Sequence, residues 1–175
     1  DVYKRQLLKD AGRDVIAVGK IFDIFDGEGV TEKIKTTGNT NGIAFTKALQ
    51  TRDFEGLAFV NLVDFDMLYG HRRDVAGYAA AATEFDKFVA DFIPGMREGD
   101  LRRQRQMCIR DRSYTKTTDH TREYVPYLIC GKGVKPGVDL GTRLCFGTIA
   151  QTICEYLDVD ASSLDGKSVW NEIKA

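Results

Sequence analysis

The sequence predicts an α/β protein, an incomplete three-layer α/β/α sandwich with a mostly parallel sheet. Two short apolar runs, at residues 14–18 and 57–63, have the near-continuous hydrophobicity of strands that are covered on both faces. Apolar residues at helical spacing follow at 42–49 and 75–96. Strands that alternate with helices are joined by right-handed crossovers, which make the strands parallel. The 175 residues are enough for one hydrophobic core.

The composition is typical of a soluble protein. Hydrophobic residues make up 43% of the chain and charged residues 29%, and the formal net charge is -1. A balanced charge gives no basic footprint for nucleic acid, and no apolar run has the length that a bilayer requires. We therefore expect no nucleic-acid partner and no membrane partner, and the sequence indicates no protein partner. No signal peptide is recognisable, so we expect a cytoplasmic location.

The four cysteines are expected to be reduced thiols. They stand at positions 108, 130, 145 and 154, without a CxxC pair and without the spacing of a disulfide framework. Cys130 and Cys154 fall in apolar runs, so burial in the core is favoured over a chemical role.

The first predicted strand, residues 14–18, is followed by Gly19 and Lys20. A lysine beside a glycine at the end of a strand can reach a phosphate group, which makes Lys20 the candidate substrate-binding residue. The alternative is an ordinary solvated lysine. Residues 27–41 are rich in glycine, threonine, asparagine and charge, and we expect them to form a loop.

Two amphipathic helices are predicted on either side of the second strand. The shorter, at 42–49, has its apolar residues at near-helical spacing. The longer, at 75–96, has charged residues opposite an apolar stripe. The stripe consists of Ala79, Phe85, Phe88, Val89 and Phe92.

The candidate site lies just after the second strand, in the stretch NLVDFDMLYGHRR. Asp66 and His71 follow the strand, and the other histidine, His120, precedes a further apolar run. Side chains at the carboxyl ends of parallel strands converge on one crevice, so these three residues predict a metal site for zinc or manganese. The five-residue step from Asp66 to His71 is too long for a helical pair and suits a turn, and Asp64 is expected to point away. The alternative is that both histidines are surface residues without a ligand.

Two stretches of the chain can be encoded by a single DNA sequence that is read in two different frames. Residues 1–6, DVYKRQ, are encoded by GATGTGTATAAGAGACAG, and a shift of one base gives the MCIRDR of residues 107–112. An upstream extension, CGTCGGCAGCGTCAG, encodes the preceding RRQRQ, and the whole string resembles a transposase-type sequencing adaptor. We interpret residues 1–6 and 102–112 as non-native and reject a nucleic-acid patch there. Irregular structure is expected across 101–113, because basic and amide side chains are costly to bury in a central strand.

The remainder of the chain predicts one more strand and one more helix. YVPYLIC at 124–130 is the strand, and Pro126 indicates an edge or irregular position. A glycine-rich turn at 131–141 leads to a helix at 142–157, and a short closing element surrounds Trp170. The buried stripe of the helix is expected to consist of Phe146, Ile149, Ile153, Tyr156 and Leu157.

Several of these segments resemble the carboxyl-terminal half of the phosphopentomutase family, within the alkaline phosphatase superfamily. They are VIAVGKIFDIFDGEGVTEKIKTTGN, VDFDMLYGHRRDVAGYAAA and TDHTREYVPYLICGKGVKPGVDLGTR. The strings YGHRRD and DHTREYVP are specific to that family. Cofactor-independent phosphoglycerate mutases and phosphatases remain the alternative relatives.

The resemblance implies a fold, a chemistry and a set of site residues. Residues 7–175 would be the carboxyl-terminal part of a metal-binding core domain with an alkaline phosphatase-like fold, without the family's cap domain. The family interconverts pentose 1- and 5-phosphates through a phosphorylated threonine and two manganese ions. Asp66, His71 and His120 would be ligands of one ion, and Lys20 would border the 5-phosphate.

The chain departs from the family at one place, and the resemblance implies that metal ligands belong there. The family has an apolar strand ending in an Asp-His-Gly metal motif where this chain has residues 102–112. Met107 and Cys108 stand near the positions of two ligands, and neither replaces a bridging carboxylate for a hard ion. The threonine nucleophile belongs to the family's amino-terminal half. We therefore expect a phosphopentomutase fragment with at most one partial metal site and no activity, or else a non-catalytic or misfolded fragment with residual metal binding.

Overall fold

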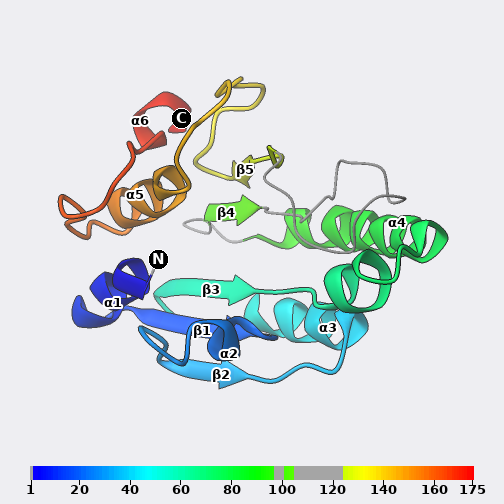
Figure 1. Ribbon diagram of the computed structural model, residues 1–175. Coiled ribbons are helices and arrows are strands. Elements are labelled where there is room, and N and C mark those ends of the chain that lie inside the picture. The colour runs from blue at the N-terminus through cyan, green and yellow to red at the C-terminus, as the bar shows by residue number, and fades with distance from the viewer. Residues whose placement is uncertain (1, 97–100, 105–123) are drawn as a thin grey trace. The chain divides into compact units, whose positions relative to one another are not determined.

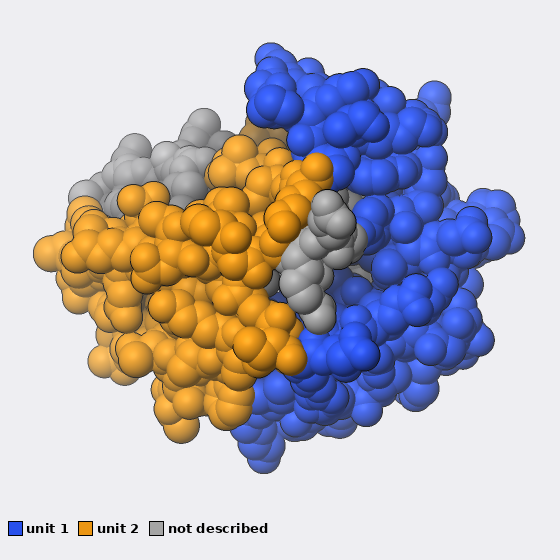
Figure 2. All heavy atoms as spheres, turned by 180° about the vertical axis from the view of Figure 1, so that it is seen from behind, with its two compact units in different colours: residues 1–35, 52–61, 133–175 blue, residues 36–51, 62–132 orange. Residues whose placement is uncertain are grey.

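The computed structural model describes residues 2–96, 101–104 and 124–175 (Figure 1). The chain forms two compact units (Figure 2). Unit 1 comprises residues 1–35, 52–61 and 133–175, and unit 2 comprises residues 36–51 and 62–132. Neither unit is a continuous stretch of chain.

Unit 1 contains a three-stranded parallel sheet in the order β2-β1-β3 (Figure 1). At the carboxyl end of β1, Val18 pairs with Ile34 on one side and with Val60 on the other. The predicted α/β class and the parallel arrangement are confirmed. The elements of unit 1 are α1 (Val2–Asp10), β1 (Asp14–Val18), α2 (Ile21–Ile24), β2 (Glu32–Ile34), β3 (Gly56–Val60), α5 (Gly147–Tyr156) and α6 (Trp170–Ile173).

Strand β1 is the centre of unit 1, as its apolar sequence predicts. Its side chains from Val15 to Val18 are completely buried. Strand β3 differs from the prediction because it ends at Val60 and is only partly covered, with Phe59 36% exposed. The reason is that β3 lies at one edge of this sheet, whereas β1 has a neighbour on each side.

Strand β2 falls within residues 27–41, which the sequence predicted to be a loop, and that prediction is wrong. The hydrophobic pattern did not reveal this strand because two of its three residues, Glu32 and Lys33, are charged. An edge strand tolerates them, since their long side chains can reach solvent and neighbouring charges. Glu32 accepts hydrogen bonds from both terminal nitrogens of Arg52, at 2.7 and 2.5 Å. Lys33 binds the Asp23 carboxylate at 2.6 Å.

Helix α1 includes most of the segment 1–6 that the sequence marks as non-native. Arg5 is only 4% exposed, and its guanidinium lies 3.6 Å from the centre of the Phe25 ring. Its Nε donates a hydrogen bond of 3.3 Å to the carbonyl of Glu28. Burial lowers the pKa of Arg5. The non-native origin of residues 1–6 stays a prediction, because a helix can form from either source.

The predicted buried face of helix α5 is correct only in part: Ile153 and Leu157 pack against a core cluster, but the most deeply buried residues are smaller ones. Cys154 is 1% exposed, so its predicted place in the core is confirmed, but Phe146 is 56% exposed. The helix begins at Gly147 and turns its small residues inward, because a Cβ at Gly147 would collide with the carbonyl of Asp165. Close backbone approach therefore decides the buried face more than hydrophobicity does. The buried residues are Gly147, Thr148, Ala150, Thr152 and Cys154.

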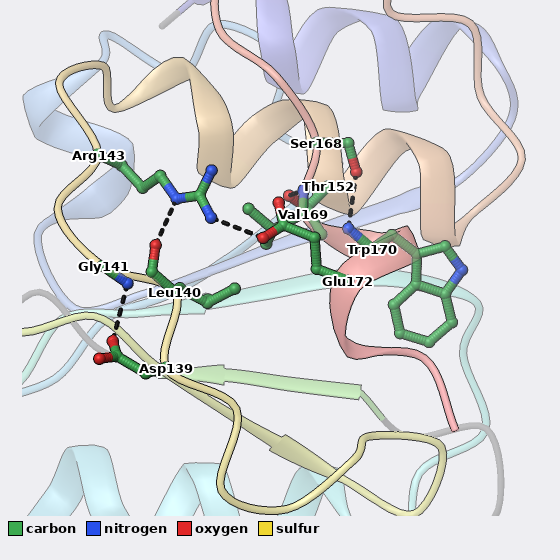
Figure 3. A network of polar contacts seen from close by, with 9 residues as sticks. All are labelled: Asp139, Leu140, Gly141, Arg143, Thr152, Ser168, Val169, Trp170 and Glu172. Carbon is green, nitrogen blue, oxygen red and sulfur yellow. Dashed lines mark hydrogen bonds and ion pairs between the residues drawn. The ribbon is translucent and has the colours of Figure 1, made fainter.

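Polar contacts hold helix α6 within unit 1 (Figure 3). Arg143 binds the Glu172 carboxylate at 2.7 Å. The hydroxyl of Thr152 accepts the backbone N–H of Val169 at 2.9 Å and donates to the carbonyl of Thr148 at 2.7 Å. Thr152 and Val169 are fully buried. The predicted closing element around Trp170 is therefore confirmed as a short, well-anchored helix.

Unit 2 is built around an aromatic cluster on α4. Its elements are α3 (Asn39–Leu49), a π-helix (Phe65–Gly70), α4 (Val75–Phe92), a 3₁₀ turn (Ile93–Gly95), β4 (Leu101–Gln104) and β5 (Leu128–Gly131). The cluster includes Phe85, Phe88 and Phe92, as predicted, but Ala79 is exposed. The predicted helix 75–96 ends at Phe92, because Pro94 has no N–H to continue the α-helical ladder.

Strands β4 and β5 form a separate antiparallel pair, and Leu101 pairs with Gly131. Two predictions are wrong here. Residues 101–104 are extended, although we expected irregular structure, and the strand expected at 124–130 begins at Leu128 and is not part of the parallel sheet. A ladder of backbone groups is open to any residue with an N–H, so a basic composition does not prevent it. Residues 105–113 lie outside the described part of the chain. None of the described helices has the length and apolarity needed to cross a membrane.

Candidate functional site

A π-helix positions the first two predicted ligands. In the segment Phe65–Gly70 each turn contains one more residue than an α-helix, and the backbone N–H of His71 donates to the carbonyl of Asp66 at 3.0 Å. Hydrogen bonding from i+5 to i places residues five apart one above the other. The sequence predicted a turn because this step does not suit an α-helix, and the structure supplies a helical turn of the rarer kind.

The side chains of Asp66 and His71 meet directly. Oδ1 of Asp66 lies 3.1 Å from Nε2 of His71. The Asp66 side chain is 34% exposed and the His71 side chain 42% exposed, so the pair is accessible from solvent. An ion pair in such a half-exposed position contributes little to stability when the imidazole is protonated. The contact between these two side chains therefore contributes little to the fold.

The spacing of this pair fits two ligands of one divalent ion. Two ligand atoms held at about 2.1 Å from an ion, close to a right angle apart, are separated by about 3 Å. A carboxylate and an imidazole are also the donor types that manganese and zinc accept. Within residues 2–96, 101–104 and 124–175, no cluster of three or more histidine, cysteine or acidic side chains could hold an ion. The role of Asp66 and His71 as metal ligands therefore stays a prediction, and His120, the third predicted ligand, lies outside the described residues.

Asp64 serves the fold instead of this pair. Its carboxylate accepts the backbone N–H of Asn39 at 2.7 Å, at the start of α3. In return the backbone N–H of Asp64 donates to Oδ1 of Asn39 at 3.0 Å. Asn39 is 5% exposed, so these two bonds satisfy buried groups at a helix amino terminus. The sequence prediction placed Asp64 away from the site on a strand argument, and the physical reason is this capping interaction.

Lys20 belongs to unit 1, whereas the Asp66–His71 pair belongs to unit 2. Lys20 precedes α2 directly after β1 and is exposed. Gly19 before it has φ +83, and a Cβ there would lie 2.5 Å from the carbonyl oxygen of Asn61. The backbone that presents Lys20 is therefore fixed by close packing. The substrate-binding role that the sequence predicted for Lys20 stays a prediction, and the packing behind it was signalled only by Gly19.

Comparisons with known proteins agree on one family. Residues 3–161 match the Metalloenzyme superfamily. The chain is 48% identical over 168 residues to the phosphopentomutase of Lachnoclostridium phytofermentans. The aligned region covers 94% of this chain and 42% of that protein. It is 49% identical over 152 residues to the phosphopentomutase of Anaeromyxobacter sp. (strain K). Here the aligned region covers 87% of this chain and 39% of that protein. The chain thus spans about two fifths of the length of these relatives.

Proposed function

Because the chain belongs to the Metalloenzyme superfamily, we propose that it is part of the catalytic core of a phosphopentomutase. The complete enzyme would interconvert the 1-phosphate and 5-phosphate of ribose or deoxyribose, which is an isomerase reaction. The observation that carries the proposal is the 48% identity to a phosphopentomutase along 94% of this chain. The solvent-accessible Asp66–His71 pair supports it independently, because the pair has the donors and the spacing of two metal ligands.

Membership of this superfamily implies a metal cofactor. We assign Asp66, His71 and His120 as ligands of one of two manganese ions in the complete enzyme. A divalent ion, when bound, neutralises phosphate charge and orients the phosphoryl group for transfer. The chain's own part is to hold the donors ready. The backbone bond from His71 to Asp66 fixes their separation, and the carboxylate brings the negative charge that a hard cation requires.

Lys20 is assigned to the substrate. A pentose phosphate carries about 1.5 to 2 negative charges at neutral pH, and an exposed ammonium on a rigid strand end can bind it without having to break an existing ion pair. Figure 1 shows α2 directly after β1, the element order that leaves Lys20 at the end of the central strand. The 5-phosphate is the group that Lys20 would bind.

Residues 1–6 and 102–112 are proposed to be foreign to the enzyme. The ligands of the second ion would then be missing, together with the threonine nucleophile, which the resemblance places outside this chain. Loss of one essential group commonly lowers a rate by several orders of magnitude, about 4 kcal/mol or more in the barrier. We therefore expect this chain alone to show no turnover of ribose 1-phosphate with manganese.

A pair of chimaeras tests the proposal. In the first, the matching part of the L. phytofermentans phosphopentomutase is replaced by residues 7–175 of this chain. In the second, residues 101–113 additionally revert to the relative's own sequence. We expect the second chimaera to convert ribose 1-phosphate to ribose 5-phosphate in a coupled assay and the first to be inactive.

Single substitutions in the active chimaera test the assigned ligands. His71→Ala and His120→Ala should each abolish turnover, whereas Asp86→Asn, an exposed position on α4, should leave it unchanged. An active first chimaera would contradict the foreign origin of residues 102–112. Full activity after His71→Ala would contradict the metal assignment.

A further inference from the structure

A group of lysines gathers at the carboxyl edge of the parallel sheet in unit 1. Val18 at the end of β1 pairs with Ile34 at the end of β2, and the N–H of Gly19 donates to the carbonyl of Ile34 at 3.0 Å. Lys20 and Lys35 are the next side chains along the two strands, so both emerge at the same edge. The carboxyl edge of a parallel sheet is where ligands bind in open α/β folds.

One carboxylate faces these lysines. Lys33 binds Asp23 at 2.6 Å and also lies 4.0 Å from the centre of the Phe22 ring. The hydrogen bond from Lys33 holds the pKa of Asp23 below its ordinary value, and the positive charges of Lys33, Lys35 and Lys20 lower it further. All three ammonium groups are therefore close enough to act on Asp23.

The charges at this edge do not balance. Lys33 is paired with Asp23, whereas Lys20 and Lys35 each add a positive charge at the ends of the paired strands β1 and β2. Glu32, the acidic residue of β2, is already bound through both oxygens to Arg52. Within the described part of the chain, Lys33 is committed to Asp23, whereas the ammonium groups of Lys20 and Lys35 have no hydrogen-bonded acceptor.

We propose that Lys35, together with Lys20, binds the phosphate group of the sugar phosphate at this edge of the sheet. The inference rests on the proposed function, which supplies the ligand class, and it adds a second phosphate-binding residue. The two positive charges of Lys20 and Lys35 match the charge of a phosphate monoester near neutral pH. The tight packing of Gly19 against Asn61 fixes the backbone before Lys20, so only side chains have to be ordered there on binding. Lys33 and Asp23 set the strength of binding through their charges and do not contact the ligand.

The proposal is tested by calorimetric titration of ribose 5-phosphate into the 175-residue chain, at low ionic strength and with a metal chelator present. Lys35→Gln and Lys20→Gln should each raise Kd by about threefold to tenfold, because each removes a charge-assisted hydrogen bond. Lys9→Gln is the matched control, since Lys9 is exposed in the last turn of α1, near the amino end of β1. It removes the same charge and should leave Kd unchanged.

A substitution that is expected to strengthen binding separates a binding role of the two lysines from a structural role. Asp23→Asn should lower Kd by about threefold, because it removes a carboxylate from this edge and leaves the charge of Lys33 unneutralised. Inorganic phosphate should compete with ribose 5-phosphate, whereas ribose should not. A Lys35→Gln variant that binds like Lys9→Gln, or an Asp23→Asn variant that binds more weakly than the parent, would overturn the proposal.

The outcome is independent of the metal assignment. The titration contains no metal ion, so loss of the Asp66–His71 pair does not alter it. An inactive second chimaera together with the expected lysine effects would reject the phosphopentomutase assignment and keep the phosphate site. An active second chimaera with no effect of Lys35→Gln would keep the assignment and reject the phosphate site.

Discussion

Asp66→Asn should separate metal binding from folding. The two side chains of the Asp66–His71 pair are 34% and 42% exposed, and ion pairs that exposed contribute up to about 1 kcal/mol. The metal-free variant should therefore unfold within about 1 kcal/mol of the parent chain. A ligand at one hundred times its Kd stabilises the folded state by about 2.7 kcal/mol, which raises Tm by roughly 5–10 °C in a chain of this size. A variant with affinity about 100-fold weaker would retain only about 0.4 kcal/mol at the same ion concentration.

Thermal unfolding followed by circular dichroism, with manganese and with a chelator, measures both quantities. Asp86→Asn is the control, because it removes the same charge from an exposed position on α4. The manganese-induced rise in Tm should be present in the parent and in Asp86→Asn, and nearly lost in Asp66→Asn. A full rise in Asp66→Asn would refute the assignment of this carboxylate as a ligand. A large loss of stability in the chelator would instead show that the pair serves the fold.

Four further substitutions test the fold of unit 1. Thr152→Val should destabilise the chain by about 1–3 kcal/mol in urea unfolding, because the buried N–H of Val169 loses its acceptor, whereas Thr152→Ser keeps the hydroxyl and should lose only about 1 kcal/mol. Gly19→Ala should cost about 1–3 kcal/mol in the same measurement, since φ +83 is strained for alanine and the new Cβ meets a carbonyl. The hydrogen bond from Arg52 lowers the pKa of the Glu32 carboxyl, so its contribution to stability is present above the unfolded pKa and is lost as pH falls through the lower folded pKa. Arg52→Gln should raise the Glu32 pKa toward its ordinary value in a carbon-detected NMR titration, and an unchanged value would contradict the pairing.

The parts of the fold that burial dictates were predictable from the sequence. Strand β1 has the predicted limits because four consecutive apolar residues can be satisfied only in an interior. The phenylalanines of α4 likewise define its inner face. Strand β2 was missed because its stability comes from ladder bonds and charge pairs, which leave no hydrophobic pattern. The buried face of helix α5 was predicted only in part for the opposite reason, since the apolar Phe146 just before the helix is exposed and small residues of the helix pack inward.

For the candidate site, the sequence predicted that Asp66 and His71 come together, but it did not predict the geometry that brings them together. The order Asp66, His71 after an apolar run indicated convergence, and the structure brings these two side chains together. The π-helix that does so has no sequence signature comparable to a cap or a glycine turn. The third member, His120, lies outside the described residues, and its role as a ligand stays a prediction.

Each unit is built from separate stretches of the chain, so its hydrophobic core can form only after the last of those stretches has been synthesised. Arg13, just before β1, donates to the carbonyl of Leu157, a partner 144 positions later. Val15 shares its core cluster with Cys154 and Ala161. A ribosome-bound chain therefore exposes one side of its most hydrophobic strand until α5 has emerged, after all of unit 2 has been made. Contacts of such long range slow folding and leave nascent apolar surface open to aggregation, so yield in the cell should depend on chaperones more than the small size of the chain implies.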